Sequence, residues 1–531
     1  MNLKRQAEER VEGGKSRIHI PLITVGEILL TIYLYFISYF YTQTVPLTWA
    51  APLRLLVIWL LVHKICGWLS GRYIVIFREA QKKNWKFGLL LLGSTFVVLG
   101  LYYAAYYPGG LIVDTFNQWY QVDKGFLVDW HPAIHTVLFL WLPSLICDSL
   151  AFVNFVQMVW ISLAVAYLGM VLESWGIPKL WCFLACFLGV AAPSSSIVMS
   201  FCWKDTALTI FVVVLVGQTI QIVFSKGRWL KNWPNLLAFA GFGALASLMR
   251  HNAILLVGPL MLLAAIFYWK ELRYYGLLAG ILTLVFMGVI KGPVYKILNV
   301  QPHSQVSAEM LGMPMTILAN VLTNEPEKLD PEAREFLYRI GDQELWEENY
   351  REGSWNSAKW MGDDISNDVI EEEGAGNVLR YTLHAVQNAP YYAYRAVVKL
   401  TEVVWKPLGN HVTWGYRISV DEGNIYGYET AGIQPLQKLL DGMRNLSLNG
   451  SFLCTWCWHI GFYMLLLMVA GVSRLKEGLA CTLLWIPVLG YNFGTALLLC
   501  GADFRFFSFN TVISFVLVLA LLCRNKGEAN E

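Results

Sequence analysis

Charged side chains are scarce in this chain. Asp, Glu, Lys and Arg make up only 15% of its 531 residues, whereas 56% are hydrophobic and the mean hydropathy is +0.48. A soluble chain of this length would carry about 25% charged residues. The shortage argues against a soluble protein, and the net charge of +2 gives no reason to expect a nucleic-acid partner.

Several familiar motifs are also missing. The chain has no Walker loop, GxGxxG fold motif, GxSxG elbow or HExxH sequence, so nothing suggests ATP or NAD. Seven of the ten cysteines sit in or beside apolar runs, which is no disulfide framework. We interpret the CxxC pair Cys454 and Cys457 as buried thiols. No internal repeat is evident, although transporters often contain one.

Apolar runs of about 20 residues, long enough to cross a bilayer, alternate with short basic patches. This pattern predicts an all-α polytopic membrane protein with about twelve transmembrane helices. The first run lacks a nearby cleavage motif, so we expect it to be retained. The predicted spans are 20–41, 51–70, 88–106, 151–171, 180–199, 206–224, 235–249, 253–269, 275–293, 453–472, 479–499 and 506–523.

Basic residues cluster in alternate loops, after the second, sixth, eighth, tenth and last spans. By the positive-inside rule these loops and both termini are cytoplasmic in the cell membrane. The external face then receives a first loop, 107–150, and the turns near residues 204, 251 and 504. The apolar run 133–147 contains Pro143 and is too short to cross, so we expect it to lie in the interface or re-enter.

Residues 294–452 differ in composition from the rest of the chain. They hold 22 acidic and 13 basic residues, which predicts an external, α-rich acidic domain. Its tryptophans can stack on sugars or simply pack the domain. The expected units are 1–87 with two helices, a core of 88–293, the domain 294–452, and the C-terminal helices 453–531. The tryptophans are Trp346, Trp355, Trp360, Trp405 and Trp414.

Asp114 is the strongest candidate for chemistry. It follows an apolar span in the block 107–119 (YPGGLIVDTFNQW), where an ionisable group is costly unless it faces water, a partner or a substrate. A carboxylate there can accept a proton from a hydroxyl. Asn117 and Gln118 supply hydrogen-bonding groups for a substrate. The alternative is that Asp114 only caps a short helix.

His131 is a second candidate, as a proton carrier or a substrate contact. His135 follows it at helical spacing, so the two rings can share a divalent metal. No further ligand is fixed by spacing, and Pro132 also suits a helix start. A metal cofactor is therefore left open.

The remaining candidates are charges at turns between spans. Lys204 can bind an anionic group while Asp205 orients it, or the two can merely neutralise each other. Arg250, with His251 and Asn252, offers a guanidinium suited to phosphate or carboxylate. Arg505 offers a second guanidinium of this kind, or its side chain reaches toward lipid headgroups.

Together these residues resemble the GT-C superfamily of integral-membrane glycosyltransferases, especially bacterial members with a YPG-x4-DT-x-x-QW block and a following His-Pro pair. The likeness continues through Trp203-Lys204-Asp205, Arg250-x-Asn252 and Phe504-Arg505-Phe506. It includes Glu309-Met310-Leu311-Gly312-Met313-Pro314-Met315, and it spans roughly residues 88–510. Each motif is short, and their order is the specific feature.

The resemblance implies sugar transfer from a polyprenyl-phosphate donor to a glycan, lipid or protein acceptor. Asp114 matches the catalytic acid of the family, and Asp205 matches the second acidic position. Lys204, Arg250 and Arg505 match candidates for the lipid phosphate. The family often has an acidic pair in its first loop, whereas Thr115 follows Asp114 here, so a metal-binding pair is not expected.

Three other functions remain open, one of which is a non-catalytic scaffold of cell-wall assembly. A lipid-linked glycan polymerase or ligase would share the donor but add a whole chain. A transporter or flippase for an amphiphile would be non-catalytic; it predicts paired half-sequences and charges near mid-membrane. The sequence shows neither feature.

Overall fold

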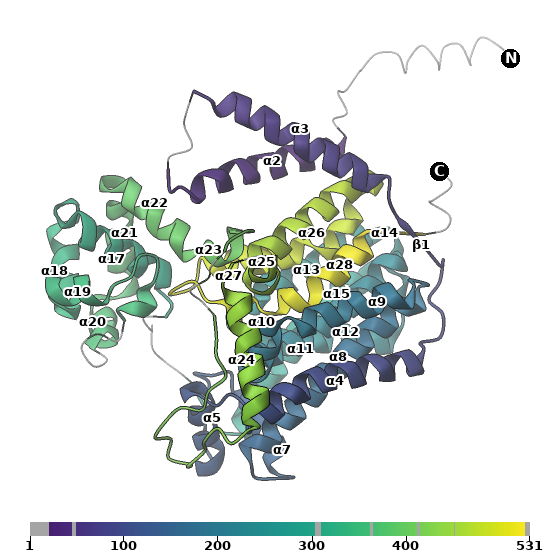
Figure 1. The fold of residues 1–531 in the computed structure, drawn as a ribbon, viewed down its shortest axis with the longest axis horizontal. Helices are drawn as coiled ribbons and strands as arrows, with labels where there is room; N and C mark the ends of the chain where they lie inside the picture. Colours follow the sequence, from purple (N-terminus) through teal and green to yellow (C-terminus); the bar gives the residue numbers. More distant parts are fainter. Residues whose placement is uncertain are drawn as a thin grey trace.

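The computed structural model describes residues 21–44, 49–302, 309–359, 361, 365–410, 412, 415–450 and 452–525. Helices dominate this part of the chain (Figure 1). Its β structure consists of two short parallel pairings. Strand β1 (Ile74–Ile76) pairs with β4 (Cys523–Asn525), and β2 (Leu127–Val128) pairs with β3 (Val300–Gln301). The expected all-α class is confirmed at this level.

Seven described helices are long and apolar enough to cross a membrane, and nine spans result if two bent helix pairs count as one span each. A multi-pass membrane protein is therefore supported, with fewer spans by this measure than the twelve predicted. The seven segments are α2 (Leu22–Phe40), α3 (Ala51–Ser70), α4 (Trp85–Ala105), α8 (Leu150–Ser174), α11 (Lys204–Phe224), Tyr274–Ile297, which begins with α15 (Tyr274–Val289), and Phe504–Leu521, which includes α28 (Phe509–Leu521).

Local breaks explain the difference between seven and twelve. Pro193 separates α9 (Lys179–Ala191) from α10 (Pro193–Met199), with a bend of 66°. His459 separates α25 (Phe452–Trp458) from α26 (Ile460–Arg474), with a bend of 83°. The other predicted spans are shorter helices, α12 (Trp233–Met249), α13 (Ile254–Phe267) and α27 (Ile486–Ala496). The run 133–147 forms a short apolar helix over 133–144, interrupted by a π-helical turn.

The basic loops meet at one end of the bundle, which we call the basic end. Ile74 N donates to Leu522 O at 2.8 Å, and Gln81 N donates to Ser174 O at 2.7 Å. Arg524 also donates to Ser70 O at 2.8 Å. Figure 1 shows β1 and α14 (Trp269–Leu272) on this side, while α5 (Val113–Lys124) and α24 (Gln434–Leu448) lie toward the other. Loop charges are thus sorted as the sequence indicated.

The acidic unit 294–452 divides into two parts. Buried residues between Leu311 and Ala396, together with Cys500, form a hydrophobic core of their own. The later residues Val403, Ile418 and Leu440 belong instead to the main core. The small core is built by α17 (Gly312–Asn324), α18 (Pro331–Ile340), α19 (Gln343–Asn349), α20 (Ile365–Glu373), α21 (Ala375–Asn388) and α22 (Pro390–Leu400), which lie beside the bundle in Figure 1.

The described tryptophans of this unit are packing residues. Trp346 and Trp355 are fully buried and stack with ring centroids 5.9 Å apart. Trp405, in α23 (Glu402–Trp405), is buried and contacts Phe40 edge-on at 5.2 Å. Trp360 and Trp414 lie outside the described residues.

Candidate active site

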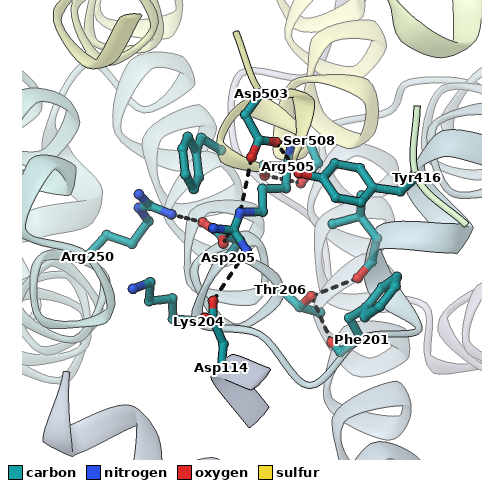
Figure 2. A network of polar contacts seen from close by, with 12 residues as sticks. Asp114, Phe201, Lys204, Asp205, Thr206, Arg250, Tyr416, Asp503, Arg505 and Ser508 are labelled. Carbon is teal, nitrogen blue, oxygen red and sulfur yellow. Dashed lines mark hydrogen bonds and ion pairs between the residues drawn. The ribbon is translucent and has the colours of Figure 1, made fainter. Parts of the chain in front are cut away.

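Four distant segments meet at the end of the bundle opposite the basic end. Asp114 lies in the first turn of α5, Asp205 in the first turn of α11, and Arg250 directly after α12. Arg505 lies in the turn before α28. Figure 2 shows these side chains pointing toward one another around the Arg505 guanidinium. The fold therefore brings together the charges that the sequence placed at separate turns.

Helix α8 holds two of these segments in place through buried amides. Asn154 donates to Pro108 O at 2.9 Å, and Gln157 donates to Phe201 O at 2.8 Å. Gly109 has φ +104°, and a Cβ there would lie 2.5 Å from the Asn154 amide, so only glycine suits this close approach. Gly110 N also donates to Ser200 O at 2.9 Å. The block 107–119 and the turn at 201–205 are thereby fixed against each other.

Arg505 is surrounded by carboxylates. Its Nη1 lies 3.3 Å from Asp114 Oδ2, and its Nε lies 3.3 Å from Asp503 Oδ2 and 3.9 Å from Asp205 Oδ2. Its guanidinium carbon is 5.2 Å from the centroid of the Trp203 ring. Aromatic faces and carboxylates both favour a planar cation at this point.

Asp205 and Arg250 form a second, more deeply buried pair. The Asp205 side chain is 2% exposed, and Arg250 Nη1 bonds its Oδ1 (Figure 2). Arg250 also lies 4.0 Å from the Phe506 ring centroid and donates from Nε to Asn252 Oδ1 at 3.2 Å. Asn252 in turn donates to Thr495 Oγ1 at 2.9 Å. Asn252 therefore orients Arg250, while His251 is exposed on the same turn.

Lys204 differs from the two arginines because, within the described chain, it forms no ion pair with a carboxylate. Its Nζ lies 3.4 Å from His131 Nδ1. Burial lowers the pKa of His131 to about 4, and the positive charge of Lys204 acts in the same direction. The neutral His131 ring can accept a hydrogen bond from the Lys204 ammonium at Nδ1. Lys204 is thus a half-buried cation that can still bind an anion.

Asp114 is kept ionised by its cationic neighbours. Burial is the largest single effect and would raise the pKa of Asp114, but Arg505, His131 and Lys204 together outweigh it, so the pKa lies below its usual value. The side chain remains 26% exposed, which leaves an oxygen within reach of a substrate. The role of helix cap is not seen, because no side-chain cap bond is formed at the start of α5.

Gln118 and Asn117 lie on the same helix but in different surroundings. Gln118 is buried, and its Oε1 accepts from His135 Nδ1 at 2.6 Å and from Thr136 Oγ1 at 3.0 Å. Asn117 is exposed and accepts from Gln121 Nε2 at 3.0 Å. Gln118 therefore fixes the 133–144 helix, and Asn117 is the freer of the two to meet a substrate.

The two histidines do not converge on a common point of coordination. His131 faces Lys204, whereas His135 is bonded to Gln118. Within the described part of the chain, no group of three or more His, Cys, Asp or Glu side chains is arranged to hold a metal ion. The described residues therefore give no support to a metal shared by the two histidines.

Sequence reasoning missed three groups that shape this site. Asp503 lies two residues before Arg505 in the sequence, which was a usable signal. Tyr416 gave none, because it lies in a loop of the acidic unit far along the chain from every other member. The Asn154 amide was hidden inside a predicted span.

Comparison with protein-family models, with curated proteins and with solved structures finds no match to this chain. The GT-C resemblance therefore remains a prediction that rests on the residues themselves. The geometry adds one physical statement: three carboxylates and three cations from four segments share one partly buried cluster.

Proposed function

We propose that the protein is a membrane glycosyltransferase of GT-C type, which moves a sugar from a polyprenyl-phosphate donor to a cell-envelope acceptor. The observation that carries this proposal is the placement of Lys204, a half-buried cation without a carboxylate partner among the described residues, within the electrostatic reach of Asp114. An anion-binding cation beside an ionised carboxylate provides both groups that this transfer needs.

The proposed chemistry uses these groups as follows. The acceptor hydroxyl oxygen attacks the anomeric carbon of the sugar, and its proton passes to Asp114. The bond between that carbon and the phosphate oxygen breaks, and the polyprenyl phosphate leaves with the electron pair. Lys204, with Arg250 and Arg505, stabilises the negative charge of the leaving phosphate. His131 keeps Lys204 in place as a neutral hydrogen-bond acceptor.

The direct test is incubation of purified protein with radiolabelled polyprenyl-phosphate sugars and membrane lipids. Transfer of one sugar supports the proposal. Transfer of a whole glycan chain would indicate a lipid-linked polymerase or ligase instead. Movement of the lipid across a vesicle membrane without transfer would indicate a flippase. The Asp114→Asn variant, run alongside, shows whether the measured activity belongs to this site.

In the proposed topology the chain crosses twelve times, both termini are cytoplasmic, and the site is external. The breaks in α9–α10 and α25–α26 and the short helices α12, α13 and α27 then lie within crossings whose backbone is satisfied by neighbouring helices. Positive charges at the basic end support this orientation.

Cys147 provides a test of that orientation. It is the one exposed cysteine of the ten, all within the described residues, and it lies on the segment that follows the 133–144 helix. In intact cells, a membrane-impermeant maleimide is expected to label wild-type protein but not Cys147→Ser. Adding Lys82→Cys at the basic end of the Cys147→Ser protein should restore labelling only after permeabilisation. The reverse pattern would place the site in the cytoplasm and contradict the proposal.

Lys204→Gln is expected to raise the donor KM about 10- to 100-fold, because a charge-assisted bond to phosphate is worth on the order of 1.5–3 kcal/mol. The acceptor KM should change little. Lys231→Gln, a charge at the opposite end of the bundle, is the matched control. An unchanged donor KM in Lys204→Gln, measured by initial rates, would remove this lysine from the phosphate site.

A further inference from the structure

Tyr416 contacts the charge cluster from a loop outside the membrane-spanning helices. Its hydroxyl donates to Asp503 Oδ1 at 2.5 Å. The same Asp503 oxygen accepts from Arg505 N at 2.9 Å, and Oδ2 lies 3.3 Å from Arg505 Nε. Figure 2 shows the series Tyr416, Asp503, Arg505 and Asp114 running across the site.

The ring of Tyr416 also contacts the aromatic neighbour of the Arg505 guanidinium. It meets the Trp203 ring edge-on, with centroids 5.4 Å apart. The Arg505 guanidinium lies over the face of that tryptophan. Tyr416 therefore sets both the carboxylate and the aromatic surface between which Arg505 is held.

The backbone after Tyr416 is tied to the segment that carries Asp114. We call residues 415–433 the strap. Leu111 N donates to Ser419 O at 3.0 Å, and Asp421 N donates to Leu111 O at 2.9 Å, in a parallel bridge. The strap ends by donating from Ile433 N to Ala104 O at 2.9 Å. The strap is thus bonded to a neighbour of each member of the Arg505–Asp114 pair. One neighbour is Asp503, which pairs with Arg505, and the other is Leu111, which precedes Asp114 by three residues.

We propose that Tyr416 is a positioning residue that divides the Arg505 guanidinium between Asp503 and Asp114 and so sets the basicity of Asp114. The inference rests on the proposed function for its catalytic consequence. The hydroxyl satisfies part of the Asp503 charge, which leaves Arg505 available to Asp114. Without that hydroxyl, Asp503 attracts Arg505 more strongly and Asp114 loses part of its cationic partner.

The sign of the effect follows from the groups that face Asp114. These are Arg505 from the turn before α28, His131 from the loop before the 133–144 helix, and Lys204 from α11. Weakening the contact between Arg505 and Asp114 lets burial raise the pKa of Asp114. A base works only when deprotonated, so the acid limb of the kcat profile moves to higher pH. Above that limb, kcat returns toward the wild-type value.

The test compares Tyr416→Phe with Tyr428→Phe. Both variants lose one hydroxyl from the strap, but the Tyr428 hydroxyl accepts from Leu150 N at 3.1 Å instead of donating to Asp503. Tyr416→Phe is expected to shift the acid limb upward by on the order of half to one pH unit with an unchanged donor KM. Tyr428→Phe should keep the wild-type profile. Identical profiles for all three proteins, or equal shifts in both variants, would overturn the role.

A second readout does not require transferase activity. An Asp whose pKa is depressed in the folded state adds stability above its unfolded pKa, and this is lost as the pH falls through the folded value. Tyr416→Phe should therefore lower Tm in detergent at neutral pH, with the gap to wild type narrowing as pH falls toward 3. In an Asp114→Asn background the gap should depend less on pH. If the Tm difference caused by Tyr416→Phe depends on pH equally in both backgrounds, the coupling between Tyr416 and Asp114 is refuted, whether or not sugar transfer is found. If the pH dependence is reduced in the Asp114→Asn background but no sugar transfer is found, only the enzymatic proposal is refuted.

Discussion

Asp114→Asn is expected to reduce sugar transfer by about 10²–10⁴-fold, the usual contribution of a positioned general base. Asparagine keeps the shape of the side chain, so the fold and the expression level should be preserved. It cannot accept the proton of the acceptor hydroxyl. Initial rates with a saturating polyprenyl-phosphate sugar measure the loss as a change in kcat.

The matched control for this variant is Asp123→Asn. Asp123 lies on the same helix, is exposed, and pairs with the exposed Lys124. Its loss should leave transfer unchanged, because exposed ion pairs contribute little. Near-wild-type turnover in Asp114→Asn would rule out its role as the base, whatever happens to the other charges of the site.

Arg250→Met is expected to have the second largest effect, this time on stability. The variant leaves Asp205 buried without its nearest cation, and breaking a buried ion pair costs about 3–5 kcal/mol. Arg505 Nε, at 3.9 Å from Asp205, offsets part of that cost. The apparent free energy of unfolding in detergent should fall by about 3 kcal/mol. Where the variant survives purification, its donor KM should rise more than its kcat falls.

Two comparisons separate a buried charge from general damage. Arg250→Met combined with Asp205→Asn removes both charges and should recover part of the stability. Arg380→Met breaks an exposed pair with Glu332 and should cost under about 1 kcal/mol. A double variant no more stable than Arg250→Met would show that the cost does not come from Asp205. An unchanged donor KM in Arg250→Met would exclude Arg250 from donor binding.

Local rules were sufficient for the coarse architecture. Apolar length predicted most of the membrane helices, and loop charges predicted which loops share an end, because both depend on the bilayer and not on distant contacts. The count of twelve spans stays a prediction. Pro193 and His459 each separate the two helices of a bent apolar pair, and a run such as 233–249 is only 17 residues long. Hydropathy averages over such breaks, so it cannot distinguish one straight helix from two bent ones.

The same limit applied to the acidic unit. Composition joined residues 294–452 because their charges are alike. The structure divides them, since Leu311 to Ala396 bury their apolar faces on one another while Ile418 and Leu440 bury theirs on the bundle. Composition reports which residues are apolar. It does not report which surface covers them.

What the sequence determined by itself was the identity of the charges and their position at the ends of apolar runs, because the cost of burying an ion in lipid restricts where ions can lie. The tertiary structure alone decided the pairing. It pairs Arg505 with Asp114 and Asp503, and it pairs Arg250 with Asp205. It also places Lys204 beside a neutral His131 and brings the Tyr416 hydroxyl to Asp503. Ion pairs are set by distances of a few ångströms between side chains that lie up to 391 residues apart in the chain, and only the packing of α5, α8, α11, α12 and α28 fixes those distances.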